Sequence, residues 1–296
     1  MHCELILPAG LEPGARLPAL ELLLARARRA YCDAQGALAW LAEACGLETL
    51  PAGALTAGEP GFWVRADPVH FLLLRDSVRI VPAGGLDESR AAALVGTLNR
   101  HFAGRHEFRA SQPDAWAMRC APQSLDAPPT AEVTGRELRE CLPAAPWPAL
   151  LNEIQMALHE DPANEGVERE ANGVWLWGAG ELPDSASAPW RSLAARDPAA
   201  LGLARLARIE AREPAAGAAQ WLESLPDEGR HLALPEGDAE TLEAHWCAPL
   251  LAALRAGRIG MLTLHAPESG VSFETVRGDL RRFWRRPRPL AAYAAR

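Results

Sequence analysis

The sequence predicts an α/β protein whose sheet core is interrupted by an inserted α+β domain. Short apolar stretches alternate with amphipathic stretches along most of the chain, which favours the strands of a sheet covered by helices. The middle of the chain instead follows a compact order of strand, strand, helix, strand, strand and helix. We therefore expect a first part of the core at residues 1–81, an inserted lid-like domain at residues 82–146 and a second part of the core at residues 147–296.

The first part of the core begins with a strand and two helices. Residues 4–8, ELILP, form the apolar run of a short buried strand that ends in a turn. Residues 17–32 place leucines on one helical stripe and arginines opposite, which predicts a helix. A second helical pattern covers residues 37–45 and stops at Gly46. Residues 51–61 are rich in Gly, Pro and Ala and predict a loop.

A strand pair and an amphipathic helix come next. Residues 69–74 and 78–81 have the composition of two strands around a turn. Asp87 is a good N-cap for a helix whose apolar positions recur every three or four residues. Residues 107–109 and 116–120 predict two further strands, and in the second of these Trp116, Met118 and Cys120 occupy alternate positions.

The rest of the chain alternates between helices and strands. A capping-box pattern at residues 134–137 opens a short helix, and residues 147–160 predict a longer one. Residues 240–256 are amphipathic, but Pro249 should kink or split that helix, which Gly257 ends. The remaining predicted strands are residues 174–177, 231–234 and 259–265.

Composition excludes several kinds of function. All thirty basic residues are arginine, so neither a Schiff-base lysine nor a P-loop lysine is available. The net charge of −8 gives no overall attraction to nucleic acid. No apolar run of about 18 residues predicts a membrane span, and residues 1–10 lack the basic and apolar regions of a signal peptide, so we expect a cytoplasmic protein. The cysteines and histidines show no metal-ligand spacing, and we expect neither a metal nor a cofactor.

The last twenty residues oppose the overall charge. RGDLRRFWRRPRPL, which starts at Arg277, contains six arginines interleaved with Phe283 and Trp284. Arginines beside aromatic rings are suited to a phosphorylated ligand or to nucleic acid. In the structural alternative, the arginines pair with the acidic body of the protein while Phe283 and Trp284 dock the segment.

Residues 150–183 combine a helix, an Asp-Pro-Ala-Asn loop and a strand that ends in Gly-Ala-Gly. This segment resembles one in archaeal-type cofactor-independent phosphoglycerate mutases and in bacterial RpfE-type regulatory proteins. The resemblance to the mutases is limited mainly to residues 60–183, whereas the resemblance to RpfE-type proteins covers nearly the whole chain. The RpfE-type similarity includes residues 63–70, 177–178, 246–251 and 282–287.

The resemblance implies a degenerate alkaline-phosphatase-like core. The mutases hold two metals with an Asp-Gly pair after the first strand and an Asp-His pair after a late strand. Here Pro8-Ala9-Gly10 and Leu264-His265 stand at those places, and Asp161 replaces a histidine of the mutase loop. The resemblance therefore implies a non-catalytic regulatory or ligand-binding protein derived from a mutase-like ancestor. The alternatives are a metal-dependent mutase or phosphohydrolase with atypical ligands, and a structural partner-binding protein.

Eight polar or glycine residues, within residues 65–70 and in the segment of residues 150–183, are candidates for ligand binding. Arginine suits an anion, asparagine both donates and accepts hydrogen bonds, and a Gly-x-Gly turn lets a phosphate approach the backbone. The candidates are Arg65, Asp67, His70, Asn152, Asn164, Arg169, Asn172 and Gly178.

A structural alternative stays open for each of these candidates. Asp67 could cap a turn beside a paired Arg65, and the asparagines could serve turns and helix caps. Asp67 and His70 are three residues apart, so in an extended strand they face opposite sides. The expected partner is an anionic small metabolite or a protein, with no membrane and no nucleic acid.

Overall fold

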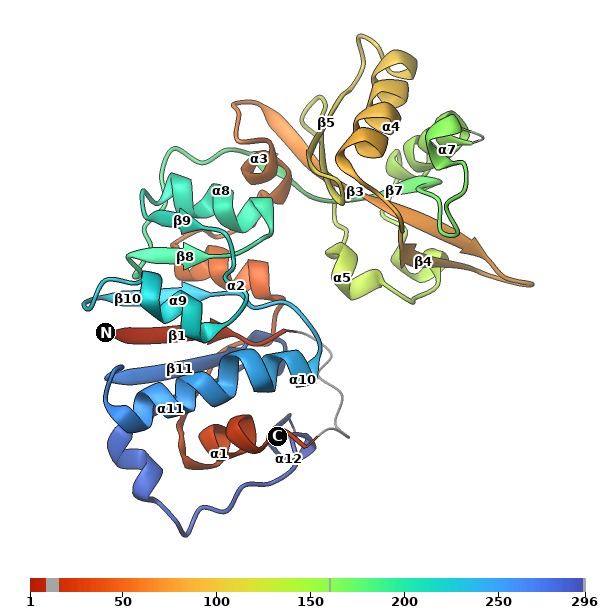
Figure 1. The fold of residues 1–296 in the computed structure, drawn as a ribbon. Coiled ribbons are helices and arrows are strands. Elements are labelled where there is room, and N and C mark those ends of the chain that lie inside the picture. Colours follow the sequence, from red (N-terminus) through yellow and green to blue (C-terminus); the bar gives the residue numbers. More distant parts are fainter. Residues whose placement is uncertain (9–15, 160, 295–296) are drawn as a thin grey trace. The chain divides into compact units, whose positions relative to one another are not determined.

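The computed structural model describes residues 1–8, 16–159 and 161–294. The chain forms two compact units, each of which combines a sheet with helices (Figure 1). The first unit comprises Met1–Leu47, Ser185–Arg196 and Leu203–Arg296, and the second comprises Glu48–Asp184 and Asp197–Gly202. The mixed α/β class predicted from the sequence is confirmed.

The first unit is built on a seven-stranded sheet in the order β2-β12-β11-β1-β10-β8-β9. The five strands from β11 to β9 run parallel, while β12 and β2 extend the sheet in antiparallel fashion. Strand β1 lies between the two late strands β10 and β11, so the centre of the sheet joins the start of the chain to its last third. The strands are β1 (His2–Ile6), β2 (Arg28–Tyr31), β8 (Ser192–Ala194), β9 (Glu210–Arg212), β10 (Arg230–Ala233), β11 (Met261–Ala266) and β12 (Val271–Val276).

One face of this sheet carries the apolar core. Cys3 and Leu5 of β1 point to that face, where they join apolar side chains of α1, α9 and α11. Removing this continuous apolar surface from water is the main force that holds the unit together. The helical segments of the unit are α1 (Pro18–Arg26), α2 (Ala37–Ala44), α9 (Ala218–Ser224), α10 (Ala239–Thr241), η2 (Leu242–Cys247), α11 (Ala248–Ala256), η3 (Pro267–Ser269), η4 (Arg277–Arg281) and α12 (Ala291–Ala294). Helix α8 (Pro198–Leu206) begins in the second unit and ends in the first.

The second unit is built on a five-stranded antiparallel sheet. The long strand β3 (Phe62–Leu73) pairs with β7 (Gly173–Glu181) along one edge and with β6 (Ala115–Arg119) and β4 (Val78–Pro82) along the other. Strand β5 (Glu107–Gln112) completes the sheet beside β6. The helical segments are α3 (Ala52–Ala57), α4 (Glu88–His101), α5 (Thr130–Val133), α6 (Leu138–Cys141), α7 (Trp147–Leu158) and η1 (Pro162–Asn164).

This compact unit extends beyond the insert expected at residues 82–146. Strands β3 and β7 lie outside those residues, yet they share a sheet with β5 and β6, which lie inside them. The pairing of β3 with β6 and β7 joins the expected insert to both of its flanking segments. The unit therefore begins at Glu48 and includes the whole chain up to Asp184.

Several local expectations are confirmed. The Asp87 side chain accepts a hydrogen bond from the Arg90 backbone and caps α4. The helix around Pro249 is split as expected, because a π-helical segment, η2, precedes α11. Proline cannot donate the next helical hydrogen bond and its ring crowds the preceding turn, so the wider π turn accommodates it.

Three local expectations are wrong. The helix expected at residues 17–32 ends at Arg26, and residues 28–31 form edge strand β2 instead, because pairing with β12 outweighs the helical pattern. The loop expected at 51–61 contains α3, whose small residues allow close packing: a Cβ at Gly53 would lie 2.4 Å from the Val64 backbone. The capping box expected at 134–137 is replaced by two four-residue helices, α5 and α6, and Glu137 makes no capping hydrogen bond with its side chain.

Some expected features fall outside the described residues. Ala9 and Gly10, at the place where the mutases have an Asp-Gly pair, are among them, as is Glu160 at the end of the expected helix 147–160. Within the described ranges, no helix has the length and apolar character that crossing a membrane requires.

Candidate functional site

The eight ligand-binding candidates all belong to the second unit. Strand β3 carries Arg65, Asp67 and His70, and β7 carries Gly178. Helix α7 carries Asn152, η1 ends at Asn164, and the segment between η1 and β7 carries Arg169 and Asn172. The structure brings some of these residues together and leaves others apart.

Arg65 is the centre of a buried polar cluster. Its side chain is 5% exposed, and its guanidinium donates to Asp67 at 2.5 Å, to the Thr56 hydroxyl at 2.8 Å and to Asp197 at 3.2 Å. The guanidinium also lies 5.6 Å from the centre of the Trp177 ring. Burial acts to lower the pKa of Arg65, but the two carboxylates outweigh it and raise that pKa. An incoming anion would have to displace a carboxylate from this guanidinium.

Asp67 is held by three donors. Besides Arg65, the Thr130 hydroxyl donates to it at 2.6 Å and the Trp177 indole N–H at 2.7 Å. Burial raises the pKa of Asp67, while Arg65 and the two hydrogen bonds act in the opposite direction. Arg65 and Asp67 are two residues apart on one strand, so their side chains share a face of the sheet. His70 belongs to a different contact, since its Nδ1 lies 2.9 Å from the Glu170 carbonyl.

Two of the asparagines hydrogen-bond to backbone groups. The Asn164 side chain donates to the Ala171 carbonyl at 3.3 Å and accepts from the Ala171 N–H at 3.1 Å. The Asn172 side chain accepts from the Phe71 N–H at 2.7 Å and donates to the Phe71 carbonyl at 3.3 Å. Each amide thus imitates a backbone partner, and together they close the loop before β7 and attach it to β3.

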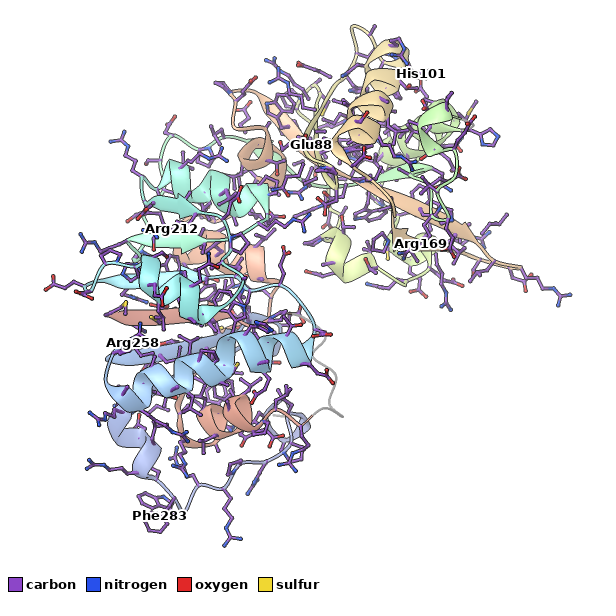
Figure 2. The ribbon with its side chains drawn as sticks, viewed as in Figure 1. Glu88, His101, Arg169, Arg212, Arg258 and Phe283 are labelled. Carbon is purple, nitrogen blue, oxygen red and sulfur yellow. The ribbon has the colours of Figure 1, made fainter. Side chains whose placement is uncertain are left out.

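The other three candidates occupy different environments. Asn152 and Arg169 are exposed, and Arg169 is labelled in Figure 2. The Arg169 carbonyl accepts a hydrogen bond from Gly84 at 2.8 Å. Gly178 has a φ of +57°, and a Cβ there would lie 2.6 Å from the Ala52 side chain. Gly178 therefore serves the close approach of α3 to β7.

The first unit contains a second buried polar cluster, on the sheet face opposite the apolar core. Glu4 of β1 is fully buried and accepts hydrogen bonds from Arg230 at 2.6 Å and from Nε2 of His265 at 2.9 Å. Nδ1 of His265 lies 2.8 Å from the Ser272 hydroxyl, and the Trp40 ring covers the imidazole with centroids 4.3 Å apart. Because an ionised Glu4 can only accept, Nε2 of His265 is the donor in that contact.

The same cluster sets the ionisation of Glu4. Burial alone would raise the pKa of this carboxyl, but the hydrogen bonds from His265 and Arg230 outweigh it and hold the pKa at about 2. His2 lies on the same face, with Nδ1 3.5 Å from the Glu4 carboxylate, and burial lowers its pKa. The signal in the sequence was a glutamate inside an otherwise apolar strand.

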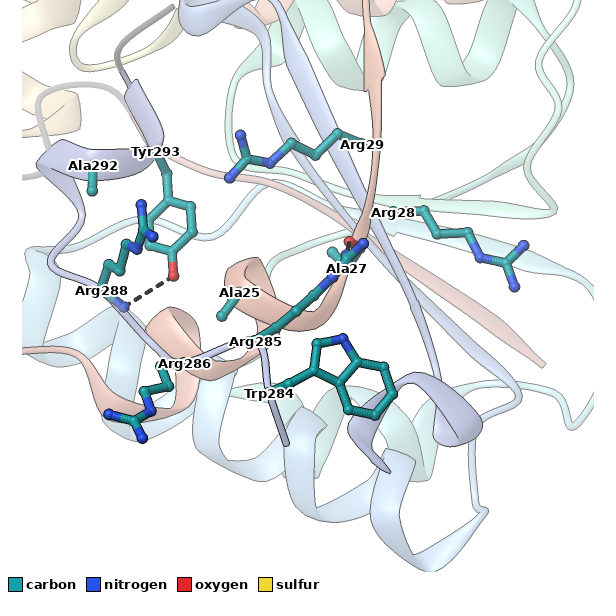
Figure 3. Close-up of a pocket in the computed structure, with 10 residues that line it drawn as sticks. All are labelled: Ala25, Ala27, Arg28, Arg29, Trp284, Arg285, Arg286, Arg288, Ala292 and Tyr293. Carbon is teal, nitrogen blue, oxygen red and sulfur yellow. Dashed lines mark hydrogen bonds between the residues drawn. The ribbon is translucent and has the colours of Figure 1, made fainter. Parts of the chain in front are cut away.

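An arginine pocket lies in the first unit and is shown in Figure 3. It encloses about 710 Å³ between the end of α1, strand β2 and the C-terminal segment. Its lining comprises Ala25, Ala27, Arg28, Arg29, Trp284, Arg285, Arg286, Arg288, Ala292 and Tyr293. Five arginines thus line one cavity, and none of its described lining residues carries a carboxylate.

The described residues do not neutralise these five arginines. None of the five forms an ion pair with a described carboxylate. Arg285 instead donates to the Ala27 carbonyl at 2.9 Å, and Arg29 lies 5.5 Å from the ring centres of both Phe273 and Tyr293. Glu274 is opposite Arg28 in the strand register but does not line the pocket.

The structural alternative for this segment is wrong where it concerns the aromatic rings. Phe283 and Trp284 are 79% and 66% exposed, so they do not dock the segment on the body of the protein. The segment is held instead by Tyr293, which is buried in the apolar core, and by hydrogen bonds to backbone carbonyls, such as that from Arg282 to Arg26 at 3.0 Å. Arg28 and Arg29 were missed as candidates because the helical pattern of residues 17–32 placed them on a helix surface.

Comparison with known proteins gives relatives in structure only. No protein-family model matches the chain, and no curated protein matches its sequence. The PH0037 protein from Pyrococcus horikoshii is similar over 93% of this chain and 87% of its own, with a TM-score of 0.55 and 14% identity. The cofactor-independent phosphoglycerate mutase from Thermoplasma acidophilum DSM 1728 matches 94% of this chain and 90% of its own, with a TM-score of 0.45 and 15% identity. At such identities the likeness concerns the fold alone.

Among the described residues, no group of three or more His, Cys, Asp or Glu side chains is placed to hold a metal ion. Five of the thirty arginines of the chain line the arginine pocket.

Proposed function

We propose that the protein is a regulatory ligand-binding protein that recognises a small anionic metabolite in the arginine pocket. The observation that carries the proposal is the set of five arginines that line one cavity of about 710 Å³, in which no described lining residue is acidic. The resemblance of the sequence to RpfE-type regulatory proteins, with the mutase-like ancestry that it implies, is in keeping with this role.

Electrostatics favours an anion at this place. Two unit charges 4 Å apart attract by about 1 kcal/mol in water and by about 4 kcal/mol near a protein surface. Guanidinium groups also bind phosphate or carboxylate oxygens through two parallel hydrogen bonds, which adds orientation to attraction. The whole chain has a net charge of −8, so the pocket is a positively charged region of an acidic protein. It concentrates anions at one site and does not attract them over the entire surface.

The lining favours binding over catalysis. Among the described lining residues there is no Asp, Glu, His, Cys or Ser that would act as a general base or a nucleophile. The phenol of Tyr293 titrates even higher than usual, because burial raises its pKa. A bound anion would therefore be held and oriented without an acid–base partner that titrates near neutral pH.

Most of the ligand-binding candidates on the second unit already have partners within the protein. Arg65 already has two carboxylate partners, and Asn164 and Asn172 hold backbone groups. Arg169 is exposed and has no carboxylate within ion-pair distance among the described residues. Of the eight ligand-binding candidates, it is therefore the one best placed to bind an anion. We assign the main anion site to the arginine pocket on the number of its unpaired guanidinium groups.

Calorimetric titration with inorganic pyrophosphate tests the proposal. The expected result is saturable binding to the full chain and a loss of affinity of at least tenfold in the double variant Arg28→Ala, Arg286→Ala. Neither of these side chains makes a hydrogen bond or ion pair among the described residues, so their removal should leave the fold intact. Arg258→Ala, an exposed arginine outside the pocket (Figure 2), is the matched control and should bind as the parent does.

Two results would contradict the proposal. One is the absence of pyrophosphate binding to the parent protein. The other is equal loss of affinity in the pocket variant and in the Arg258→Ala control, which would show a general effect of charge.

A further inference from the structure

We infer that the ligand of the arginine pocket is a nucleoside polyphosphate, with its base on Trp284 and its phosphates among the five arginines. This inference rests on the proposed function and goes further by naming the class of ligand. Three features of the pocket carry it: the amount of positive charge, an exposed indole in the lining, and arginines that are held in place before any ligand arrives.

The charge of the pocket matches a chain of phosphates. A monophosphate ester carries at most about two negative charges, and each further phosphate adds roughly one. Five guanidinium groups without carboxylate partners would be left largely unneutralised by a single phosphate. A diphosphate or triphosphate comes closer to the charge present, and its length lets it reach arginines from both strand β2 and the C-terminal segment.

Trp284 provides a surface for a base. The indole lines the pocket yet is 66% exposed, so one of its faces is available to an incoming ring. In Figure 3 it lies at one side of the pocket, while Arg288 and Tyr293 lie at the other. Bases stack readily on aromatic side chains, and flanking guanidinium planes extend such a platform. An inorganic anion would make no use of this exposed apolar surface.

Two of the arginines are already positioned. Arg29 packs against the rings of Phe273 and Tyr293, with its guanidinium carbon 5.5 Å from each ring centre. Arg285 is fixed by its hydrogen bond to the Ala27 carbonyl at the end of α1. A guanidinium has five N–H groups, so this single bond leaves Arg285 with donors for a phosphate. Side chains ordered in advance lose less freedom when the ligand binds, which favours affinity.

The size and setting of the pocket favour a single nucleotide over a nucleic acid strand. The cavity of about 710 Å³ falls within the range of small-molecule pockets. A long strand would run from the pocket over a protein whose net charge is −8, and repulsion would oppose it.

Three probes and one pair of variants test the inference. ATP carries both base and phosphates, tripolyphosphate carries the phosphates alone, and adenosine carries the base alone. The expected result is that ATP binds the full chain at least about fivefold more tightly than tripolyphosphate, and adenosine binds far more weakly than either. Trp284→Ala should abolish the advantage of ATP and leave tripolyphosphate binding unchanged. Met156→Ala removes an exposed apolar side chain of the second unit, which is outside the lining, and should change neither the binding of ATP nor that of tripolyphosphate.

The outcomes separate this inference from the proposed function. Equal binding of ATP and tripolyphosphate, unaffected by Trp284→Ala, would overturn the nucleotide inference and leave the anion site standing. If neither ATP nor tripolyphosphate binds, both the nucleotide inference and the proposed anion site are overturned. Affinity for single-stranded oligonucleotides that rises steeply with length beyond a few residues would also overturn it, because the ligand would then be a nucleic acid strand.

Discussion

Replacing Glu4 with glutamine removes the one negative charge that organises the buried cluster of the first unit. Glu4 is fully buried, and its carboxylate accepts hydrogen bonds from Arg230 and His265. Glutamine keeps nearly the same shape and resembles the protonated form of the carboxyl. The variant therefore isolates what ionisation of Glu4 contributes to stability.

The magnitude follows from the pKa of Glu4. Hydrogen bonds from His265 and Arg230 outweigh the opposing effect of burial and hold this pKa at about 2 instead of 4.5. The difference is about 2.5 pH units, which at about 1.4 kcal/mol per unit corresponds to about 3 kcal/mol of stability. Because the pKa is lower in the folded protein, this contribution is complete above pH 4.5 and disappears as the pH falls from about 4.5 to about 2.

The assay is urea unfolding of the parent protein and Glu4→Gln between pH 7 and pH 2.5. The parent is expected to be about 3 kcal/mol more stable at pH 7, and this difference should shrink steadily below pH 4.5. Glu223→Gln, an exposed glutamate with no hydrogen bond or ion pair among the described residues, serves as control and should show a difference near zero throughout. A difference for Glu4→Gln that is absent, or that stays constant down to pH 2.5, would refute the reasoning.

Three further predictions concern the second unit and the pocket. Asp67→Asn leaves the buried Arg65 without its nearest carboxylate and should lower the free energy of unfolding by roughly 3–5 kcal/mol in urea titrations; a loss below about 1 kcal/mol would contradict this. Gly173→Ala places a Cβ 2.2 Å from the Phe71 ring and should destabilise by about 1–3 kcal/mol in thermal unfolding. Gly96→Ala, within α4, should instead stabilise the protein by up to about 1 kcal/mol. A Gly173→Ala variant more stable than the Gly96→Ala variant would contradict the packing argument. Pyrophosphate affinity should fall roughly tenfold or more when salt is raised tenfold, and a salt-independent affinity would argue against the arginine pocket.

The sequence was most informative where one local rule governs the structure. Asp87 has the chemistry of an N-cap and caps α4, and Pro249 cannot continue a regular helix and is preceded by a π turn. These outcomes depend on a few neighbouring residues. The α/β class was predictable for a related reason, since the apolar faces of alternating strands and helices are buried only when they pack against each other.

Features that depend on distant partners were not predictable. Residues 28–31 continue a helical pattern, yet they become β2 because β12, far away in the chain, offers a strand to pair with. The arginine pocket is assembled from that strand and from the C-terminal segment, so it could not be recognised while residues 17–32 were expected to be one helix. The pairing of Arg65 with Asp197 likewise joins residues 132 positions apart.

Amide hydrogen exchange with and without saturating pyrophosphate tests the central claim most directly, because it locates the anion on the chain. If the arginine pocket is the site, exchange should slow in the peptides that cover residues 25–31 and 282–293 and stay unchanged in those that cover residues 62–73 and 164–178. Slower exchange at residues 62–73 and 164–178, with none at the pocket, would contradict the account and place the anion beside Arg65 and Asn164.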